Sequence, residues 1–218
     1  MITIVKMIQR RNRKEKKRVL IGMSGGIDSS VAALLLKKQG YDVIGVTFKM
    51  FDGQNNTCSS EEIISDAKKV AKQLNIEHHI VNLKKEFDKK VIKYFISEYL
   101  AGRTPNPCTV CNRYVKFEEL LKLAKEINIP YVATGHYAKV EKVEDRYILK
   151  KSESISKDQT YFLYDLTQEQ LSKILFPLEK LEKTEIRKIA EEEKLVVAQK
   201  DDSQEVCFIP DNNYREFV

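Results

Sequence analysis

Several features that assign chains to common protein classes are missing from this sequence. No apolar run approaches the roughly 20 residues that a membrane-spanning helix needs, and the apolar stretch from Met1 to Met7 is too short for a secretory signal. No second C-x-x-C accompanies Cys108 and Cys111, which disfavours a structural zinc site of four cysteines. The four cysteines of the chain therefore favour catalytic or metal chemistry over disulfides, and we expect a cytoplasmic protein with no membrane partner.

The composition is that of a globular protein with one basic segment. The 218 residues are 42% hydrophobic and 32% charged, enough for an α/β domain and an appendage. The formal charge of +6 arises between Gln9 and Arg18, where seven Lys or Arg residues accompany one Glu. We treat residues 1–17 as a basic arm that would bind nucleic-acid phosphates. A solvated tail without a partner and an Arg-rich organelle presequence are the alternatives.

Residues 24–30, Ser-Gly-Gly-Ile-Asp-Ser-Ser, lie between an apolar segment, Val19 to Met23, and a run of helix formers. A glycine turn between a strand and a helix directs backbone N–H groups and a helix N-terminus at an anion. Glycines let a phosphate approach the backbone closely, and Asp28 fits beside a bound Mg²⁺. The run lacks the Gly-Lys-Ser/Thr ending of a Walker loop. It predicts a phosphate-binding loop of another kind, and an ordinary helix-capping turn is the alternative.

Apolar, β-branched runs alternate with helical patterns in the first two thirds of the chain. The expected strands are residues 18–23, 42–48, 77–83 and 130–135, and the expected helices are 29–39, 60–74, 86–100 and 114–127. This alternation predicts an α/β fold in which a parallel sheet has helices on both faces. Because ligands bind at the carboxyl ends of such strands, residues 24–30, 49–51 and 135–137 are expected around one crevice.

The pattern changes after residue 137. A hairpin is expected over 139–142 and 146–150, then a polar stretch, and then helices over 168–175 and 184–193. We therefore expect a first domain of residues 18–150 and a small, mainly helical module of residues 151–218, which stops at the opening of another helix.

The cysteines fall in different contexts. Cys108 and Cys111 follow two prolines that predict an extended loop between helices. Cys207 lies near the end of the chain, and Cys58 precedes a helix without other chemical groups nearby, so we regard Cys58 as incidental. His78 and His79 lie inside an expected strand, where packing or edge exposure is a better explanation than metal ligation.

Taken together, the motifs resemble those of a known enzyme family. The glycine loop resembles the SGGxDS loop of the N-type ATP pyrophosphatases, or PP-loop enzymes. TPNPxxxCN at 104–112, Lys116-Phe117, ATGHY at 133–137, KDQTYF at 157–162 and DSQEVCFIP at 202–210 follow in an order similar to that of the tRNA-specific 2-thiouridylases. The resemblance runs from Arg18 to the last residue and implies the adenine nucleotide alpha hydrolase-like fold, with residues 151–218 as a truncated tRNA-binding adaptor module.

The resemblance also implies a reaction and a set of site residues. ATP adenylates the carbonyl oxygen at position 2 of the wobble uracil, a cysteine persulfide delivers sulfur, and AMP leaves. Cys207 would carry the persulfide, Cys111 would be the second catalytic cysteine, and Asp28 would act with Mg²⁺. The target base would meet Asn106, Pro107 and Cys108, and tRNA would meet His136, Lys157, Asp158 and Gln159. The residues that would bind ATP are Gly22, Met23, Ser24, Gly25, Gly26, Ile27, Asp28, Ser29, Phe48 and Gly135.

Two departures from the family pattern leave alternatives open. Many members have Asp where this chain has Cys108, so a [4Fe–4S] cluster on Cys108, Cys111 and Cys207 is a second route for sulfur. The family continues into a β-barrel domain that is absent here, so we expect a fragment or a short form that needs a separate domain or partner chain, besides tRNA and a sulfur-donor or relay protein. Another PP-loop adenylating enzyme and a non-catalytic nucleotide- or cluster-binding subunit are the rival functions.

Overall fold

A five-stranded parallel sheet forms the centre of the computed structural model, which describes residues 17–51, 61–201, 206–209 and 213–218. The strand order is β3-β2-β1-β4-β7, and all four neighbouring pairs are parallel. The predicted α/β fold with a parallel sheet is therefore confirmed. The strands are β1 (Arg18–Gly22), β2 (Asp42–Lys49), β3 (Glu77–Asn82), β4 (Tyr131–Ala133) and β7 (Ile174–Leu175).

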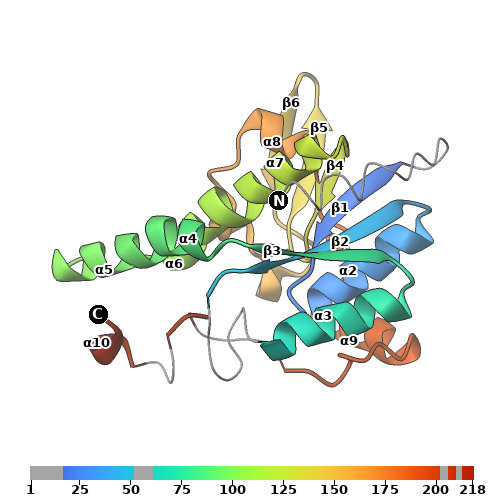
Figure 1. The fold of residues 1–218 in the computed structure, drawn as a ribbon. Coiled ribbons are helices and arrows are strands. Elements are labelled where there is room, and N and C mark those ends of the chain that lie inside the picture. Colours follow the sequence, from blue (N-terminus) through green and yellow to red (C-terminus); the bar gives the residue numbers. More distant parts are fainter. Residues whose placement is uncertain (1–16, 52–60, 202–205, 210–212) are drawn as a thin grey trace.

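Each face of the sheet has its own hydrophobic core, because successive side chains of a strand point to opposite faces. On β1, Leu20 belongs to one cluster, whereas Val19 and Ile21 belong to the other. The second cluster joins the sheet to α2 (Ile27–Lys38), α3 (Glu61–Gln73) and α9 (Lys183–Glu192). These three helices lie together below the strands in Figure 1.

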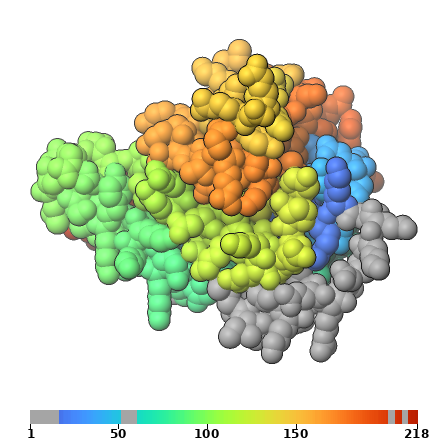
Figure 2. All heavy atoms as spheres, turned by 90° about the horizontal axis from the view of Figure 1, so that it is seen from above, coloured from blue at the N-terminus to red at the C-terminus, as the bar shows by residue number. Residues whose placement is uncertain are grey.

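Two long helices, each with a π-helical segment, cover the opposite face. The first runs through α4 (Lys84–Phe87), η1 (Asp88–Ile92) and α5 (Lys93–Leu100). The second runs through α6 (Pro107–Cys111), η2 (Asn112–Phe117) and α7 (Glu118–Glu126). Their far ends extend beyond the sheet, and Figure 2 shows this green end protruding from the molecule. Lys90 of η1 donates a hydrogen bond to the backbone oxygen of Tyr114 in η2 at 2.7 Å, so the two π-helical segments are directly joined.

The expected extended loop around Cys108 and Cys111 is wrong. Pro107 occupies the first turn of α6, where its missing N–H costs nothing. Asn106 caps the helix by accepting hydrogen bonds from the backbone N–H groups of Cys108 (3.0 Å) and Thr109 (3.4 Å). An asparagine followed by proline thus starts a helix here, and both cysteines lie on it.

The chain after β4 returns to the same sheet. The predicted hairpin is confirmed as β5 (Lys139–Val143) and β6 (Arg146–Lys150). The helix expected over 168–175 is shorter, because α8 (Gln168–Leu171) ends and β7 pairs with β4 as the edge strand. The predicted domain boundary at residue 150 stays a prediction, and the sheet uses strands from both sides of it. The remaining elements are η3 (Ile155–Lys157), η4 (Thr160–Phe162) and α10 (Tyr214–Phe217).

None of the helices described is both long and apolar enough to cross a bilayer. The basic arm up to residue 16 lies outside the described residues, as does Cys58.

Candidate nucleotide and cysteine site

The glycine loop connects the carboxyl end of β1 to the N-terminus of α2, as its sequence predicts. The Ser29 hydroxyl accepts a hydrogen bond from the backbone N–H of Ser24 at 3.1 Å and lies 3.2 Å from the Ser24 hydroxyl. Ser30 donates to the backbone oxygen of Gly26 at 2.7 Å. Gly26 is the N-cap of α2 and has no side-chain cap. The serines therefore hold the loop from within, and the helix N-terminus has capacity for an anion.

Two glycines allow the backbone around the loop to pack closely. Gly25 has φ +69°, and a Cβ there would lie 2.4 Å from the backbone oxygen of Ile63 in α3. A Cβ on Gly135, which follows β4, would lie 2.6 Å from the backbone nitrogen of Ser29. The loop after β1 and Gly135 after β4 thus pack backbone against backbone, and a side chain at position 135 would disrupt this contact. Gly135 and the loop, both predicted to bind ATP, are together in the structure.

Asp28 has two partners that the sequence analysis did not select. Its Oδ1 accepts hydrogen bonds from the Tyr137 hydroxyl and from the Lys183 ammonium group, both at 2.7 Å. Lys183 is the first residue of α9, which packs through Ile186 and Ala190 against the core shared with α2. The Lys183 side chain is 12% exposed, so its charge lies beside the loop in a partly desolvated position.

No sequence signal marks Lys183, because it is one of 38 Lys and Arg residues and lies 155 positions from Asp28. Tyr137 forms part of the ATGHY motif, but its role beside Asp28 has no local signature. The aspartate carboxylate fits a Mg²⁺ ion in kind, since such ions commonly bind one or two carboxylates together with substrate phosphates. Within the described residues, no three His, Cys, Asp or Glu side chains gather to form a metal site made by protein alone.

Cys111 lies close to the residue that follows β2. Its side chain is buried, and the thiol lies 3.9 Å from the Met50 sulfur. β1 and β2 are adjacent strands whose carboxyl ends share one edge of the sheet. The buried thiol and the glycine loop therefore lie at the same edge. Asn112, the next residue, is buried, and its Oδ1 has no hydrogen-bond partner in the described part of the chain.

Cys108 and Cys207 occupy different surroundings from Cys111. Cys108 is exposed on α6, whereas Cys207 is half-buried against the core that contains Cys111. The segment carrying Cys207 is anchored by Phe208, whose ring packs edge-on against Phe87 (5.5 Å) and Phe95 (5.3 Å). In the part of the chain that the structure describes, none of these three cysteines forms a disulfide bond. Three thiolates are the kind of ligand that a [4Fe–4S] cluster takes, while no three His, Cys, Asp or Glu side chains of the described residues surround a single metal ion.

The segment predicted to meet tRNA is attached to Tyr137. Gln159 accepts a hydrogen bond from the Tyr137 backbone N–H at 3.0 Å and donates its own N–H to the Tyr137 oxygen at 2.9 Å. Asp158 accepts bonds from the Thr160 hydroxyl and the Ser152 backbone. These contacts place residues 157–159 within reach of the loop, and Lys157 ends η3.

His136 and Phe48 are more enclosed than the sequence suggests. The His136 ring packs against Phe117 (5.6 Å) and Phe176 (6.5 Å), and its Nδ1 lies 2.8 Å from the Thr134 hydroxyl. Burial, aided by the nearby charge of Lys116, lowers the pKa of His136 to about 3, so the ring is neutral at pH 7. The Phe48 side chain lies in the core against the long helices.

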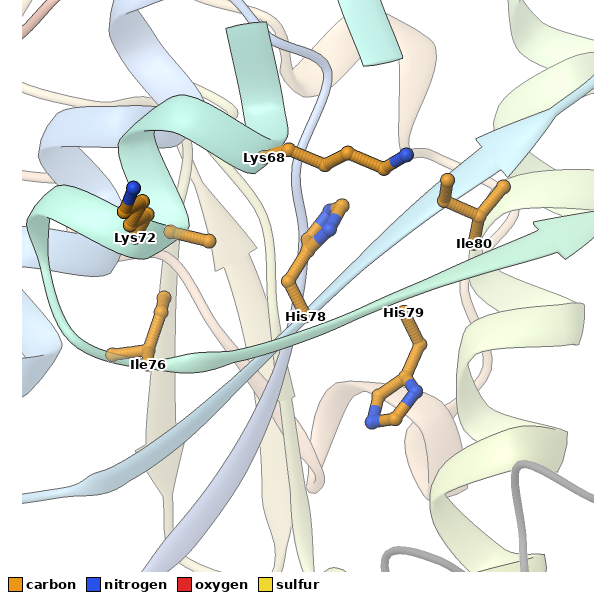
Figure 3. A pocket seen from close by; sticks show the side chains of 7 residues that line it. Lys68, Lys72, Ile76, His78, His79 and Ile80 are labelled. Atoms are coloured by element: carbon orange, nitrogen blue, oxygen red, sulfur yellow. The ribbon is translucent and has the colours of Figure 1, made fainter. Parts of the chain in front are cut away.

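His78 connects the outer edge of the sheet to the start of the loop. Figure 3 shows a hollow beside β3 in which His78 points toward the α3 side and His79 points the other way. The Nε2 atom of His78 lies 2.8 Å from the Thr47 hydroxyl, which donates to the backbone oxygen of Met23. Burial is the main cause that lowers the pKa of His78 to about 4. The packing interpretation of His78 agrees with this geometry.

Comparisons with known proteins identify the family of the chain. Residues 17–211 match the family described as "tRNA methyl transferase HUP domain". The chain is 54% identical over 208 residues to the tRNA-specific 2-thiouridylase MnmA of Clostridium kluyveri, covering 93% of this chain and 58% of that protein. It is 52% identical over 209 residues to the MnmA of Clostridioides difficile, covering 93% of this chain and 58% of that protein. The chain thus spans less than two thirds of these relatives.

Solved structures share the fold. The U34-tRNA thiolase NcsA from Methanococcus maripaludis, solved with its [4Fe–4S] cluster, has a TM-score of 0.56 and 22% identity, covering 95% of this chain and 68% of that one. The NMN synthetase of Francisella tularensis has a TM-score of 0.52 and 18% identity, covering 93% of this chain and 73% of that one. The chain has a glycine-rich loop after β1 and a close glycine contact from β4, and the family model matches nearly the whole sequence: the chain belongs to the tRNA methyl transferase HUP domain family.

Proposed function

We propose that this chain is the catalytic part of a cytoplasmic tRNA sulfurtransferase that converts the wobble uridine of tRNA to 2-thiouridine. Uracil O2 attacks the α-phosphorus of ATP, and pyrophosphate leaves. The terminal sulfur of a Cys207 persulfide then bonds to C2 of the base, and AMP leaves. Attack of Cys111 on the inner sulfur of Cys207 frees the thiouridine and forms a disulfide, which a thiol reductant opens. A separate sulfur-donor protein would reload Cys207.

The position of Cys111 carries this proposal. Its thiol lies beside Met50, directly after β2, while the phosphate loop extends from the neighbouring strand β1. Adjacent parallel strands are about 4.8 Å apart, so an activated base bound at this edge could meet both the nucleotide and a thiol. An adenylating enzyme that joins an acid to an amine would have no use for this cysteine.

Different residues of the chain would bind different parts of ATP and its metal ion. Backbone N–H groups of the loop would bind pyrophosphate, and Lys183 would add positive charge beside Asp28. Mg²⁺, when bound at Asp28, would offset the charge of the pyrophosphate. Because the Phe48 side chain is buried, an adenine contact at this position would come from its backbone. Tyr137 would hold Asp28 in place by its hydrogen bond.

Two reactions measured on the same variants test the proposal. ATP–pyrophosphate exchange in the presence of tRNA reports adenylation, and mass spectrometry of tRNA nucleosides reports 2-thiouridine. Asp28→Ala should abolish both, whereas Cys111→Ser should abolish thiolation and keep exchange. Cys58→Ser is the matched cysteine control and should change neither. Exchange that is unaffected in Asp28→Ala would refute the nucleotide site, and thiolation by Cys111→Ser would refute the sulfur chemistry.

Cys108 separates the persulfide route from the cluster route. In the persulfide route, Cys108→Ala should keep thiolation, because sulfur passes only between Cys207 and Cys111 and this exposed thiol takes no part in the transfer. The protein should be purified without oxygen and its iron content measured. Activity that follows iron content and disappears in Cys108→Ala would support the cluster as sulfur carrier and overturn the persulfide step.

A further inference from the structure

Three tyrosines are exposed in one region of the molecule. Tyr161 and Tyr164 are each 65% exposed, and Tyr114 is 38% exposed. The chain has 19 aromatic residues, 10 Tyr and 9 Phe. Among the described residues, no other aromatic side chain is as exposed to solvent as these three. Exposed rings that come from separate segments and share one surface mark an interaction site more strongly than single exposed side chains do.

Arg113 joins the two segments that carry these rings. Its guanidinium group lies 4.6 Å from the ring centre of Tyr114 and forms an ion pair with Asp165 at 2.6 Å. Asp165 is the residue after Tyr164. The hydrogen bond to Asp165 is the main cause that raises the pKa of Arg113, and Tyr114 and Tyr164 add smaller electrostatic contributions. Arg113 is therefore held between both segments with its charge retained.

The surface lies next to the cysteines of α6. Tyr161 belongs to η4, which packs against α6, the helix of Cys108 and Cys111. In Figure 2 the orange surface of the segment after the hairpin adjoins the light-green surface of the second long helix. Gln159, two residues before Tyr161, is bonded to Tyr137 beside the nucleotide loop. The exposed rings thus lie on the surface next to the nucleotide and cysteine site at the sheet edge.

Exposed tyrosine rings combined with a guanidinium plane have a specific chemical use. Unpaired bases stack on aromatic side chains and on Arg planes, and this stacking tolerates any base because every base has a π-face. A duplex buries its bases and cannot stack in this way. Asp165 pairs with Arg113 here, so this guanidinium charge is already balanced and the surface suits base contacts better than phosphate contacts.

We propose that Tyr114, Tyr161, Tyr164 and Arg113 form a stacking surface for unpaired RNA bases that flank the modified uridine. This inference rests on the proposed function, and it adds the part of the RNA that the surface takes: single-stranded loop nucleotides rather than the paired stem. The bases would lie along η4 and the start of η2, outside the cysteine site.

Fluorescence anisotropy with two labelled RNAs tests the surface on the full chain. One probe is an anticodon stem–loop, and the other is its stem closed as a blunt duplex. Tyr161→Ala and Tyr164→Ala should each weaken binding of the stem–loop roughly 5- to 150-fold, the range for one lost base stack. Tyr161→Phe keeps the ring and should bind within about twofold of the unchanged chain. Val196→Ala shortens another exposed apolar side chain, one that is 56% exposed and lies elsewhere, and it should have no effect.

Salt dependence and a competing partner complete the test. The tyrosine variants should lose affinity without changing the slope of log K against log salt, because they make no phosphate contacts. Unchanged stem–loop binding in both alanine variants, or an equal loss for the duplex, would overturn the stacking surface alone. Failure of the unchanged chain to bind either RNA would overturn the proposed function as well. Loss of binding to a sulfur-donor protein instead of RNA would assign the surface to a protein partner and refute the proposal.

Discussion

Replacing Gly26 by Ala adds one methyl group to the loop in a place where the protein itself has room. Gly26 has φ −97° and ψ 172°, an extended conformation that alanine adopts without strain. The nearest heavy atom to the new Cβ would be the Ser24 hydroxyl oxygen at 3.6 Å, an ordinary contact. The remaining cost is the poorer N-cap, about 1 kcal/mol or less. Stability should therefore change little.

ATP affinity should respond far more strongly to the same change. A phosphate oxygen bonded to a backbone N–H lies about 2.9 Å from the nitrogen, close enough for a methyl group on the next atom to displace it. We expect at least tenfold weaker ATP binding, which corresponds to about 1.4 kcal/mol. Calorimetric titration with ATP and Mg²⁺ measures the affinity, and thermal unfolding followed by circular dichroism measures the stability.

Gly135→Ala is the matched variant because its methyl group meets protein instead of open space. The Cβ would lie 2.6 Å from the Ser29 nitrogen and 2.8 Å from the Asp28 carbonyl carbon, and backbone cannot rotate away. Overpacking of this kind costs about 1–3 kcal/mol, so both the melting temperature and the affinity should fall. Gly26→Ala that binds ATP as tightly as the unchanged chain would refute a close phosphate approach at this loop.

Three further outcomes are expected. Lys183→Met should weaken ATP binding with little change in fold, because the ammonium group bonded to Asp28 supplies positive charge beside the loop. Lys183→Arg keeps the charge and should restore part of the lost affinity. Titration with ATP measures the affinity of both variants. Cys207→Ser should abolish thiolation but keep ATP–pyrophosphate exchange, as should Cys111→Ser. His136 has a folded-state pKa of about 3, below its usual 6.5, so its contribution to stability is present above pH 6.5 and is lost as the pH falls. Between pH 6.5 and 4 this histidine should lower the free energy of unfolding by up to about 1.4 kcal/mol per pH unit, and urea denaturation of His136→Asn should show a flatter pH dependence.

The predicted elements that match the structure are those governed by local pattern. The strands before and after the glycine loop follow from continuous apolar runs, which parallel strands with two buried faces require. The hairpin at 139–150 follows from two short runs around a turn, and Glu144 in that turn has φ +53°. The helix after residue 183 begins within one residue of its predicted start.

The errors occur where local signals conflict with one another. Prolines before Cys108 suggested a loop, but proline at the first position of a helix is well tolerated, and the Asn106 cap decided the outcome. The residues at 174–175 continue a helical pattern in sequence, yet they pair with β4. Backbone hydrogen bonds at the open edge of a sheet can override the weak helical preference of two residues.

The sequence by itself determined the glycine loop between β1 and α2, the first four strands of the sheet, and the cysteines to consider. Each of these features depends on residues only a few positions apart, because the backbone freedom of glycine, the spacing of apolar residues and helix capping are all local effects. Only the tertiary structure decided that Tyr137 and Lys183 bond to Asp28 from 109 and 155 positions away, and that Cys111 is buried beside Met50. Such contacts depend on how the sheet brings distant strand ends to one edge and how α9 packs on α2, and no local pattern of side chains records that path.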